Sequence, residues 1–246
     1  MALTQILQLI ILIFAAVVPS LIFLSWFRSA STGKRESWLQ LLILFLYGAI
    51  IAVVIAILIE LLAITLLLSP VFREYEILSR NPSLLSLIIV VVIAPFAEEF
   101  AKMLGLLKSS TKLRQTKSGF VFGAATGLGF AATENLLYES VAMAEGGVLM
   151  FLTVALLRSY SSALLHGSAT SIVGYGVAKK RFEGKSITPY YLFAVMMHGA
   201  FNLLVSLGGL FDDNRSIIVS GFGLFLSFVL VLLAIKFINS KLNKKI

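Results

Sequence analysis

Residues 38–68 read WLQLLILFLYGAIIAVVIAILIELLAITLLL, which is 31 residues with a single charged side chain, that of Glu60. About twenty apolar residues are enough to carry a helix across the hydrocarbon core of a bilayer. Lipid offers no hydrogen-bond partners to the backbone, so a run of this kind must be a helix that satisfies its own N–H and C=O groups. The segment therefore predicts a membrane-spanning helix.

Runs of the same kind recur along the whole chain. Of its 246 residues 59% are hydrophobic and 13% charged, and the mean hydropathy is +0.99. Soluble domains are roughly 45–50% apolar and about 25% charged. The chain contains no cysteine, which excludes disulfides and thiol catalysis. We predict an all-α, polytopic transmembrane bundle of about seven spans, at residues 4–27, 38–68, 84–107, 118–141, 148–178, 188–208 and 216–238.

The charged residues between the spans predict an orientation. Lys and Arg gather in the connections after the first, third and fifth spans and in the tail. The other connections contain fewer Lys and Arg residues and carry Asp and Glu as well. The positive-inside rule then places the N-terminus outside and the C-terminus in the cytosol of a multi-pass cell-membrane protein. The net charge of +8 is explained by this topology and by attraction to anionic lipid, so no nucleic-acid partner is expected.

Eleven polar or charged side chains of note lie inside the predicted spans, where a charge at mid-span costs roughly 2.5–3.5 kcal/mol. All but one of them lie in the third to sixth spans. We therefore expect one integral membrane domain, 1–246, in which 84–208 form a four-helix polar catalytic core and 1–83 and 209–246 supply peripheral spans. The side chains are Glu60, Glu98, Glu99, Lys102, Glu134, Asn135, Glu139, Arg158, His166, His198 and Asn202.

The third span contains two adjacent glutamates, Glu98 and Glu99, and Lys102, which lies three and four residues further on and can reach either carboxylate. We expect Lys102 to neutralise one glutamate while the other points at the bundle centre. The alternative is an ionic cluster that only locks helix packing. In the fourth span Glu134 has no basic residue within two turns, so its counter-charge is expected from another span or from a metal.

The same fourth span carries Gly119, Gly123 and Gly127 at a spacing of four residues. Glycines at this spacing form a smooth face on which another helix can approach closely. We predict that these three glycines serve helix packing.

The two histidines of the chain, His166 and His198, both lie inside spans, together with three buried glutamates. Two histidines and a glutamate with an open water position make a catalytic zinc site. In this interpretation Glu134, His166 and His198 bind Zn²⁺, Glu98 or Glu99 is the general base, and Asn202 holds the oxyanion or the substrate. Lys102, Arg158 and Asn135 support the site, Arg158 by neutralising Glu139, Glu60 or a site carboxylate.

A metal-free mechanism stays open at this point. In that mechanism a glutamate activates water directly, and His198 and Asn202 donate hydrogen bonds to the oxyanion. The spacing of the residues does not distinguish the two chemistries, because no pair of ligands has the helix-local spacing of a His-Glu-x-x-His motif.

Four motifs in order give a family resemblance. They are Glu-Glu-x-x-Lys at 98–102, Gly-x-Gly-Phe-x-x-x-Glu-Asn at 127–135, Arg158 with His166 eight residues on, and His-x-x-x-Asn at 198–202. The chain resembles, over about residues 90–205, the PrsW family of intramembrane proteases, which is distantly similar to type II CAAX prenyl endopeptidases and the gamma-secretase scaffold subunit. The resemblance implies site-1-type cleavage of membrane-anchored proteins such as anti-sigma factors. It also implies that Glu98, Glu99 and His198 are essential.

Two other classes of protein compete with the protease. A membrane scaffold would use the buried polar residues to hold the transmembrane helix of a partner without cutting it, but a scaffold has no need of a second carboxylate beside one already paired. A proton-coupled transporter would use Glu and His as a relay, but transporters usually show matched repeats, which this chain lacks.

Overall fold

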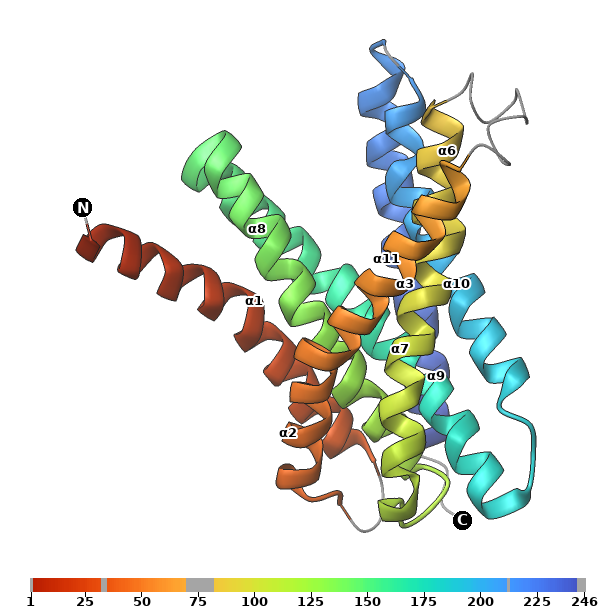
Figure 1. Ribbon diagram of the computed structural model, residues 1–246. Helices are drawn as coiled ribbons and strands as arrows, with labels where there is room; N and C mark the ends of the chain where they lie inside the picture. The colour runs from red at the N-terminus through yellow and green to blue at the C-terminus, as the bar shows by residue number, and fades with distance from the viewer. Residues whose placement is uncertain (1, 32–34, 70–81, 212, 243–246) are drawn as a thin grey trace.

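The computed structural model describes residues 2–31, 35–69, 82–211 and 213–242, and its regular secondary structure over these ranges is helical, with no strand among them (Figure 1). The predicted all-α class is therefore confirmed. Some of the charges that predicted the orientation lie outside the described residues, namely Lys34, Arg73, Glu74, Glu76, Arg80, Asp212, Lys244 and Lys245.

Nine α-helices make up most of the described structure. They are α1 (Ala2–Ala30), α2 (Trp38–Leu46), α3 (Val53–Leu67), α6 (Pro82–Ile88), α7 (Ala94–Ser109), α8 (Ser118–Tyr160), α9 (Ser162–Glu183), α10 (Thr188–Ser206) and α11 (Arg215–Leu242). Two π-helical segments, η1 (Tyr47–Ala52) and η2 (Ile89–Ile93), join α2 to α3 and α6 to α7. Two 3₁₀ turns, η3 (Ser110–Lys112) and η4 (Leu207–Leu210), follow α7 and α10.

Six helical stretches of the described chain are long and apolar enough to cross a membrane, at 5–30, 38–67, 82–112, 118–183, 188–210 and 215–242. The fourth of them, with 66 residues, is more than twice the length that one crossing needs. It is interrupted at Gly147, where φ is 66° and ψ is −159°. A backbone in this left-handed region strongly favours glycine.

The chain reverses direction at Gly147, so that the two arms of this stretch run antiparallel (Figure 1). A methyl group built on Gly119, Gly123 or Gly127 of the first arm would meet the backbone of Gly174, Thr170 or His166 of the second, respectively. Along the sequence, the two members of each pair lie equally far from the Gly146–Gly147 peptide, as expected for a hairpin that turns there. The two arms raise the number of crossings to seven, in agreement with the predicted count and with the predicted spans 118–141 and 148–178.

The contacts of the three glycines confirm that they serve helix packing, and they yield a prediction. Gly123→Ala would place its new methyl group against the carbonyl of Thr170 and the Cα of Ser171, and backbone cannot move aside as a flexible side chain can. We expect this change to lower the free energy of unfolding by about 1–3 kcal/mol, the usual cost of overpacking. Thermal unfolding in detergent measures the change.

Gly221→Ala provides the matched control, because Gly221 also lies within a helix but has nothing within 4 Å of the new methyl group. This substitution should be neutral or should stabilise the protein by up to about 1 kcal/mol, the helix-propensity difference between the two residues. Equal shifts in the two variants would contradict the close approach of α8 and α9.

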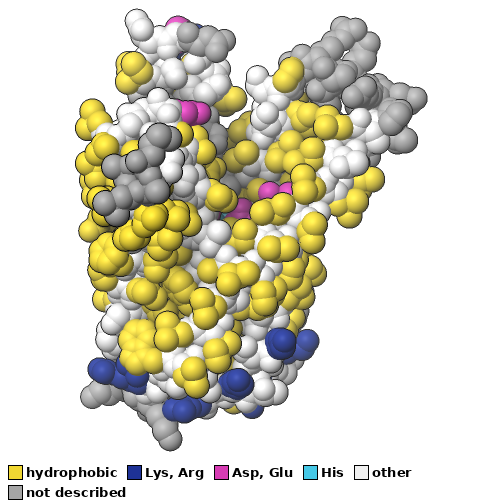
Figure 2. Space-filling view, turned by 60° about the vertical axis from the view of Figure 1, so that its left-hand side comes forward, with side chains coloured by type: hydrophobic (Ala, Val, Ile, Leu, Met, Phe, Trp, Pro, Cys, Tyr) yellow, Lys and Arg dark blue, Asp and Glu magenta, His cyan; other side chains and the backbone are white. Residues whose placement is uncertain are grey.

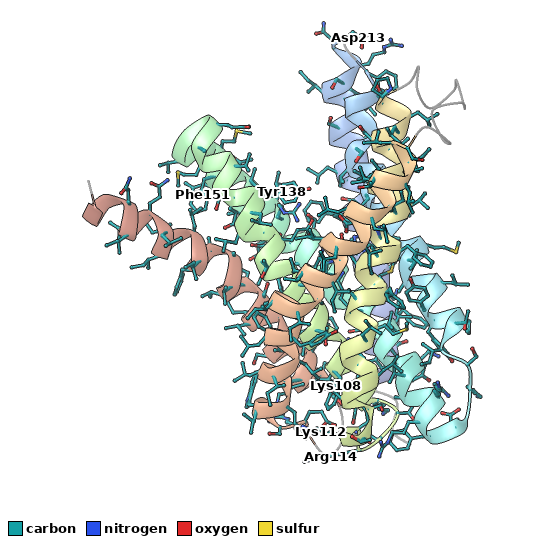
Figure 3. The ribbon with its side chains drawn as sticks, viewed as in Figure 1. Lys108, Lys112, Arg114, Tyr138, Phe151 and Asp213 are labelled. Atoms are coloured by element: carbon teal, nitrogen blue, oxygen red, sulfur yellow. The ribbon has the colours of Figure 1, made fainter. Side chains whose placement is uncertain are left out.

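The two ends of the bundle differ in charge. Lys108, Lys112 and Arg114 lie at one end and Asp213 at the opposite one (Figure 3), and Lys and Arg side chains gather at the first of these ends (Figure 2). By the positive-inside rule the basic end faces the cytosol. At the other, extracytoplasmic end, α1 and the α8–α9 hairpin diverge from the group formed by α3, α6, α10 and α11 (Figure 1).

Candidate active site

The buried ionic cluster begins on α7, which carries both adjacent glutamates. Glu98 is 8% exposed and Glu99 fully buried, as is Lys102. The Lys102 Nζ atom lies 3.2 Å from Glu98 Oε2 and 2.9 Å from Glu99 Oε1. The ammonium group thus contacts both carboxylates rather than one of them, so the expectation that only one glutamate is neutralised by Lys102 is wrong.

His166, on α9, joins this cluster to α8. The Lys102 ammonium donates to His166 Nδ1 over 2.9 Å, and His166 Nε2 lies 2.7 Å from Glu134 Oε2. The counter-charge of Glu134 comes from Arg158, whose terminal nitrogen is 3.0 Å from Glu134 Oε2. Because Arg158 belongs to the returning arm of the hairpin, the prediction of a partner from another span is confirmed. Arg158 neutralises a site carboxylate, which is one of the roles predicted for it.

His198 enters from α10 and completes the cluster. Its Nδ1 atom is 3.2 Å from Glu99 Oε1, and its Nε2 atom is 3.9 Å from Glu98 Oε2. The rings of His166 and His198 meet edge to face, with centroids 4.7 Å apart. Both rings are buried. Helices that are far apart in the sequence therefore place the two histidines next to each other.

The hydrogen-bond partners define which nitrogen of each ring carries a proton. An ionised carboxylate only accepts hydrogen bonds, so His166 Nε2 donates to Glu134 and His198 Nδ1 donates to Glu99. The lone pairs are left on His166 Nδ1 and His198 Nε2, which lie 3.7 Å and 3.9 Å from Glu98 Oε2. In both rings, the nitrogen that can bind a metal is the one nearer Glu98.

Glu98, His166 and His198 form a group of donors that could hold a metal ion, since their ligand atoms all lie within 4.8 Å of one another. For comparison, the ligand atoms of a tetrahedral zinc ion lie 2.0–2.1 Å from the ion and therefore about 3.3 Å from one another. Histidines that bind metals usually donate their other N–H to a carboxylate or a carbonyl, as both do here. The chemistry of these three donors therefore suits a divalent metal ion.

The structure brings the other predicted site residues to the same region. Asn135 Oδ1 accepts a hydrogen bond of 2.9 Å from Arg158 Nε. Asn202 Nδ2 donates over 2.9 Å to the carbonyl of Val90, in the π-helical segment η2 that precedes the two glutamates. The wide turn of a π-helix is often found at functional sites. The catalytic and metal-binding roles assigned to these residues from the sequence remain predictions.

Two site residues were not assigned a role from the sequence. The first is Thr170, whose Oγ1 donates over 2.9 Å to Glu99 Oε2. The second is Phe130, whose ring centroid lies 4.0 Å from the Lys102 ammonium. Thr170 follows His166 by four residues on the same helix, and that spacing was the available signal. The contact between Phe130 and Lys102 had no counterpart in the sequence, because it joins α8 to α7.

A cavity of about 460 Å³ leads to the cluster. Glu98, Glu134, His166 and Asn202 line it, together with apolar side chains of α3, η2, α8 and α10 and with Glu60 of α3. Figure 2 shows a hollow with mostly apolar walls in which acidic side chains are visible. Glu99 and His198 do not line this cavity.

The fold and the site define a class of protein: a multi-pass membrane hydrolase with a carboxylate–imidazole cluster that can bind a metal in its interior. Comparison with known proteins supports this class. The model of the family described as PrsW family intramembrane metalloprotease matches residues 36–235, and this chain belongs to that family. The chain is 28% identical over 202 residues to Protease PrsW of Clostridioides difficile (strain 630). This alignment covers 77% of each of the two sequences. No solved structure matches it.

The chain is therefore an intramembrane endopeptidase of a metalloprotease family and a multi-pass membrane protein, as predicted. Its substrate is a protein in the lipid bilayer, because a protease within the membrane acts on what the membrane contains.

Proposed function

We propose that this protease uses a zinc ion held by Glu98, His166 and His198 to hydrolyse a peptide bond of a membrane-anchored protein. One observation carries the proposal: each histidine donates its proton to a carboxylate, and the unprotonated nitrogen of each ring lies within 3.9 Å of Glu98 Oε2. Two neutral imidazoles and one carboxylate, next to a cavity from which water can reach them, are a ligand set of catalytic zinc sites.

When bound, zinc would polarise the scissile carbonyl and bring the pKa of a water molecule down toward 7. The chain must then supply a proton acceptor. Glu134 is suited to this role, because His166 and Arg158 hold only its Oε2 atom. Oε1 has no hydrogen bond within the described part of the chain, and the residue lines the cavity. A carboxylate placed in this way can take the proton of the water and pass it to the leaving amine.

This proposal exchanges two roles that the sequence suggested, since there Glu134 was the ligand and Glu98 or Glu99 the base. Glu99 is a poor base because Lys102, His198 and Thr170 all donate to it and it has no exposed surface. Its role is to fix the ring of His198. Removing such a partner of a metal-binding histidine typically costs 10–100-fold in affinity or activity.

Lys102 and Asn202 complete the arrangement. The Lys102 ammonium contacts Glu98 Oε2 and His166 Nδ1, two of the three proposed donors, and would compete with a cation for them. It has Glu99 as a third partner, to which it can remain bound when the other two turn to the metal. Asn202 lines the cavity, and one N–H of its amide is left over after the bond to Val90, so it can donate to the substrate carbonyl.

Proteolysis itself can be tested on isolated bacterial membranes. The purified protease and its Glu98→Gln variant are each reconstituted with the membrane proteins, and new N-termini are identified by mass spectrometry. We expect a set of termini in single-pass proteins that appears only with the unchanged protein. Partner proteins that bind both forms and are cut by neither would favour a scaffold instead. That the substrate is of the anti-sigma-factor class stays a prediction from the family resemblance.

A further inference from the structure

Glu60 is the one carboxylate of the cavity wall that the mechanism above leaves without a role. It lies on α3, in the predicted peripheral part of the chain, and lines the same cavity as Glu98 and Glu134. Its side chain is half-buried, and its carboxylate makes no hydrogen bond and no ion pair with any described residue. A charge inside a membrane span costs roughly 2.5–3.5 kcal/mol, so an unpaired one calls for a functional explanation.

Every other charged group at the cavity has a partner of opposite charge. Glu98 is paired with Lys102 over 3.2 Å, and Glu134 is paired with Arg158 over 3.0 Å. Lys102 itself is fully buried beneath the wall and is also bound to Glu99. Glu60 is thus the one carboxylate of the cavity wall without a cationic partner among the described residues, and together with the three carboxylates that share Lys102 and Arg158 it makes the cavity attractive to a cation.

Glu60 lies at the end of the cavity wall of α3 that is nearer the extracytoplasmic side. Val53, Ala56 and Ile57 precede it on the cavity wall, and it is the last lining residue before α3 ends at Leu67. The lining residues of α8 and α10 likewise continue past the cluster in the direction of the extracytoplasmic ends of these helices. A peptide that enters from that side meets Glu60 before it reaches Glu98.

We infer that Glu60 binds the side chain of a lysine or arginine in the substrate, so that the protease selects membrane proteins with a basic residue close to the scissile bond. The inference rests on the proposed function. An ammonium or guanidinium group in this partly desolvated position would form a charge-assisted hydrogen bond with Glu60, which is stronger than a neutral one. The apolar residues around Glu60 would accommodate the aliphatic stem of either side chain.

The experiment begins with the cleavage sites that the unchanged protein produces in bacterial membranes. One of these sites is converted into a set of fluorogenic transmembrane peptides that carry Lys, Gln or Glu at each of the three positions on either side of the scissile bond. The ratio of kcat/KM between matched Lys and Gln peptides is measured for the unchanged protein, Glu60→Gln and Glu60→Lys. Glu145→Gln is the control, because Glu145 is an exposed residue of α8 outside the cavity.

At one of the six substituted peptide positions, we expect the unchanged protein to prefer Lys to Gln. Glu60→Gln should lower the Lys-to-Gln ratio of kcat/KM at that position by about 10- to 100-fold, because the charged partner of the lysine is lost. Each factor of ten corresponds to about 1.4 kcal/mol of interaction. Glu60→Lys should shift the preference to Glu, and the control should keep the original ratio. A ratio near one for the unchanged protein would overturn the inference and leave the proposed function intact. A uniform loss for all peptides in Glu60→Gln would also overturn it. No cleavage by the unchanged protein would overturn the proposed function itself.

Discussion

Glu134→Gln is expected to lower kcat for peptide hydrolysis by about 10²- to 10⁴-fold, the usual contribution of a general acid–base group. Glutamine has the shape of glutamate, so it can still bond to His166 and Arg158, which lie 2.7 Å and 3.0 Å from Glu134 Oε2. It cannot take a proton from water at the pH of the assay. The bound metal should remain, because Glu134 is not one of the three proposed ligands. Single-turnover cleavage of a fluorogenic transmembrane peptide measures the loss.

The control for this variant is Glu145→Gln, an identical chemical change on the same helix at an exposed position. It should leave kcat unchanged. If Glu134→Gln instead lost its metal together with its activity, Glu134 would be a ligand, as the sequence suggested, and the exchange of roles between Glu98 and Glu134 would be wrong. A variant with full activity would exclude Glu134 from both roles.

His198→Ala is expected to abolish metal binding and to lower kcat/KM by at least about 1,000-fold. The stabilisation of developing charge by a metal is worth several kcal/mol, and each 1.36 kcal/mol is a factor of ten in rate. His198 Nε2 is one of three donors, and His166 and Glu98 alone would leave the ion with two protein ligands. The side chain is buried against Glu99, so thermal unfolding must be followed in parallel to establish that the variant folds.

Met196→Ala is the matched control on α10, since Met196 is 72% exposed and two residues away from His198. It should keep both metal and activity. An inactive but folded His198→Ala variant with a full complement of metal would restrict His198 to a hydrogen-bonding role. That result would exclude His198 as a ligand and leave it the oxyanion-stabilising role that the alternative mechanism gave to it.

Much of the fold could be predicted from the sequence because a bilayer allows few alternatives. Apolar runs must be helices, and the basic connections orient them, so the spans and the two arms around Gly147 were found at nearly the right residues. The π-helical segments η1 and η2 were not predicted. Their wider turns leave no periodic signal within an apolar run, since they depend on contacts with other helices, such as that of Asn202 with Val90.

The residues of the site were also predictable, but their roles were not. Charged and imidazole side chains inside spans are costly, which singled out the residues that the structure brings together. The glutamate near the unprotonated nitrogen of His166 is the candidate ligand, and the glutamate that accepts the N–H of the ring is not. Which glutamate meets which nitrogen depends on how α7 and α8 pack against α9, and the sequence does not reveal this packing. The division into a polar core, 84–208, and peripheral spans stays a prediction, and Glu60 shows that α3 also contributes to the cavity.

The central claim, that Glu98 binds the metal and Glu134 does not, is tested most directly by elemental analysis of purified protein. The unchanged protein, Glu98→Gln and Glu134→Gln are purified in detergent without chelator, equilibrated with zinc and freed of unbound metal. We predict about one zinc per chain in the unchanged protein and in Glu134→Gln, and much less than one in Glu98→Gln. Zinc retained in Glu98→Gln and lost from Glu134→Gln, or no zinc in any of the three, would contradict the proposed site.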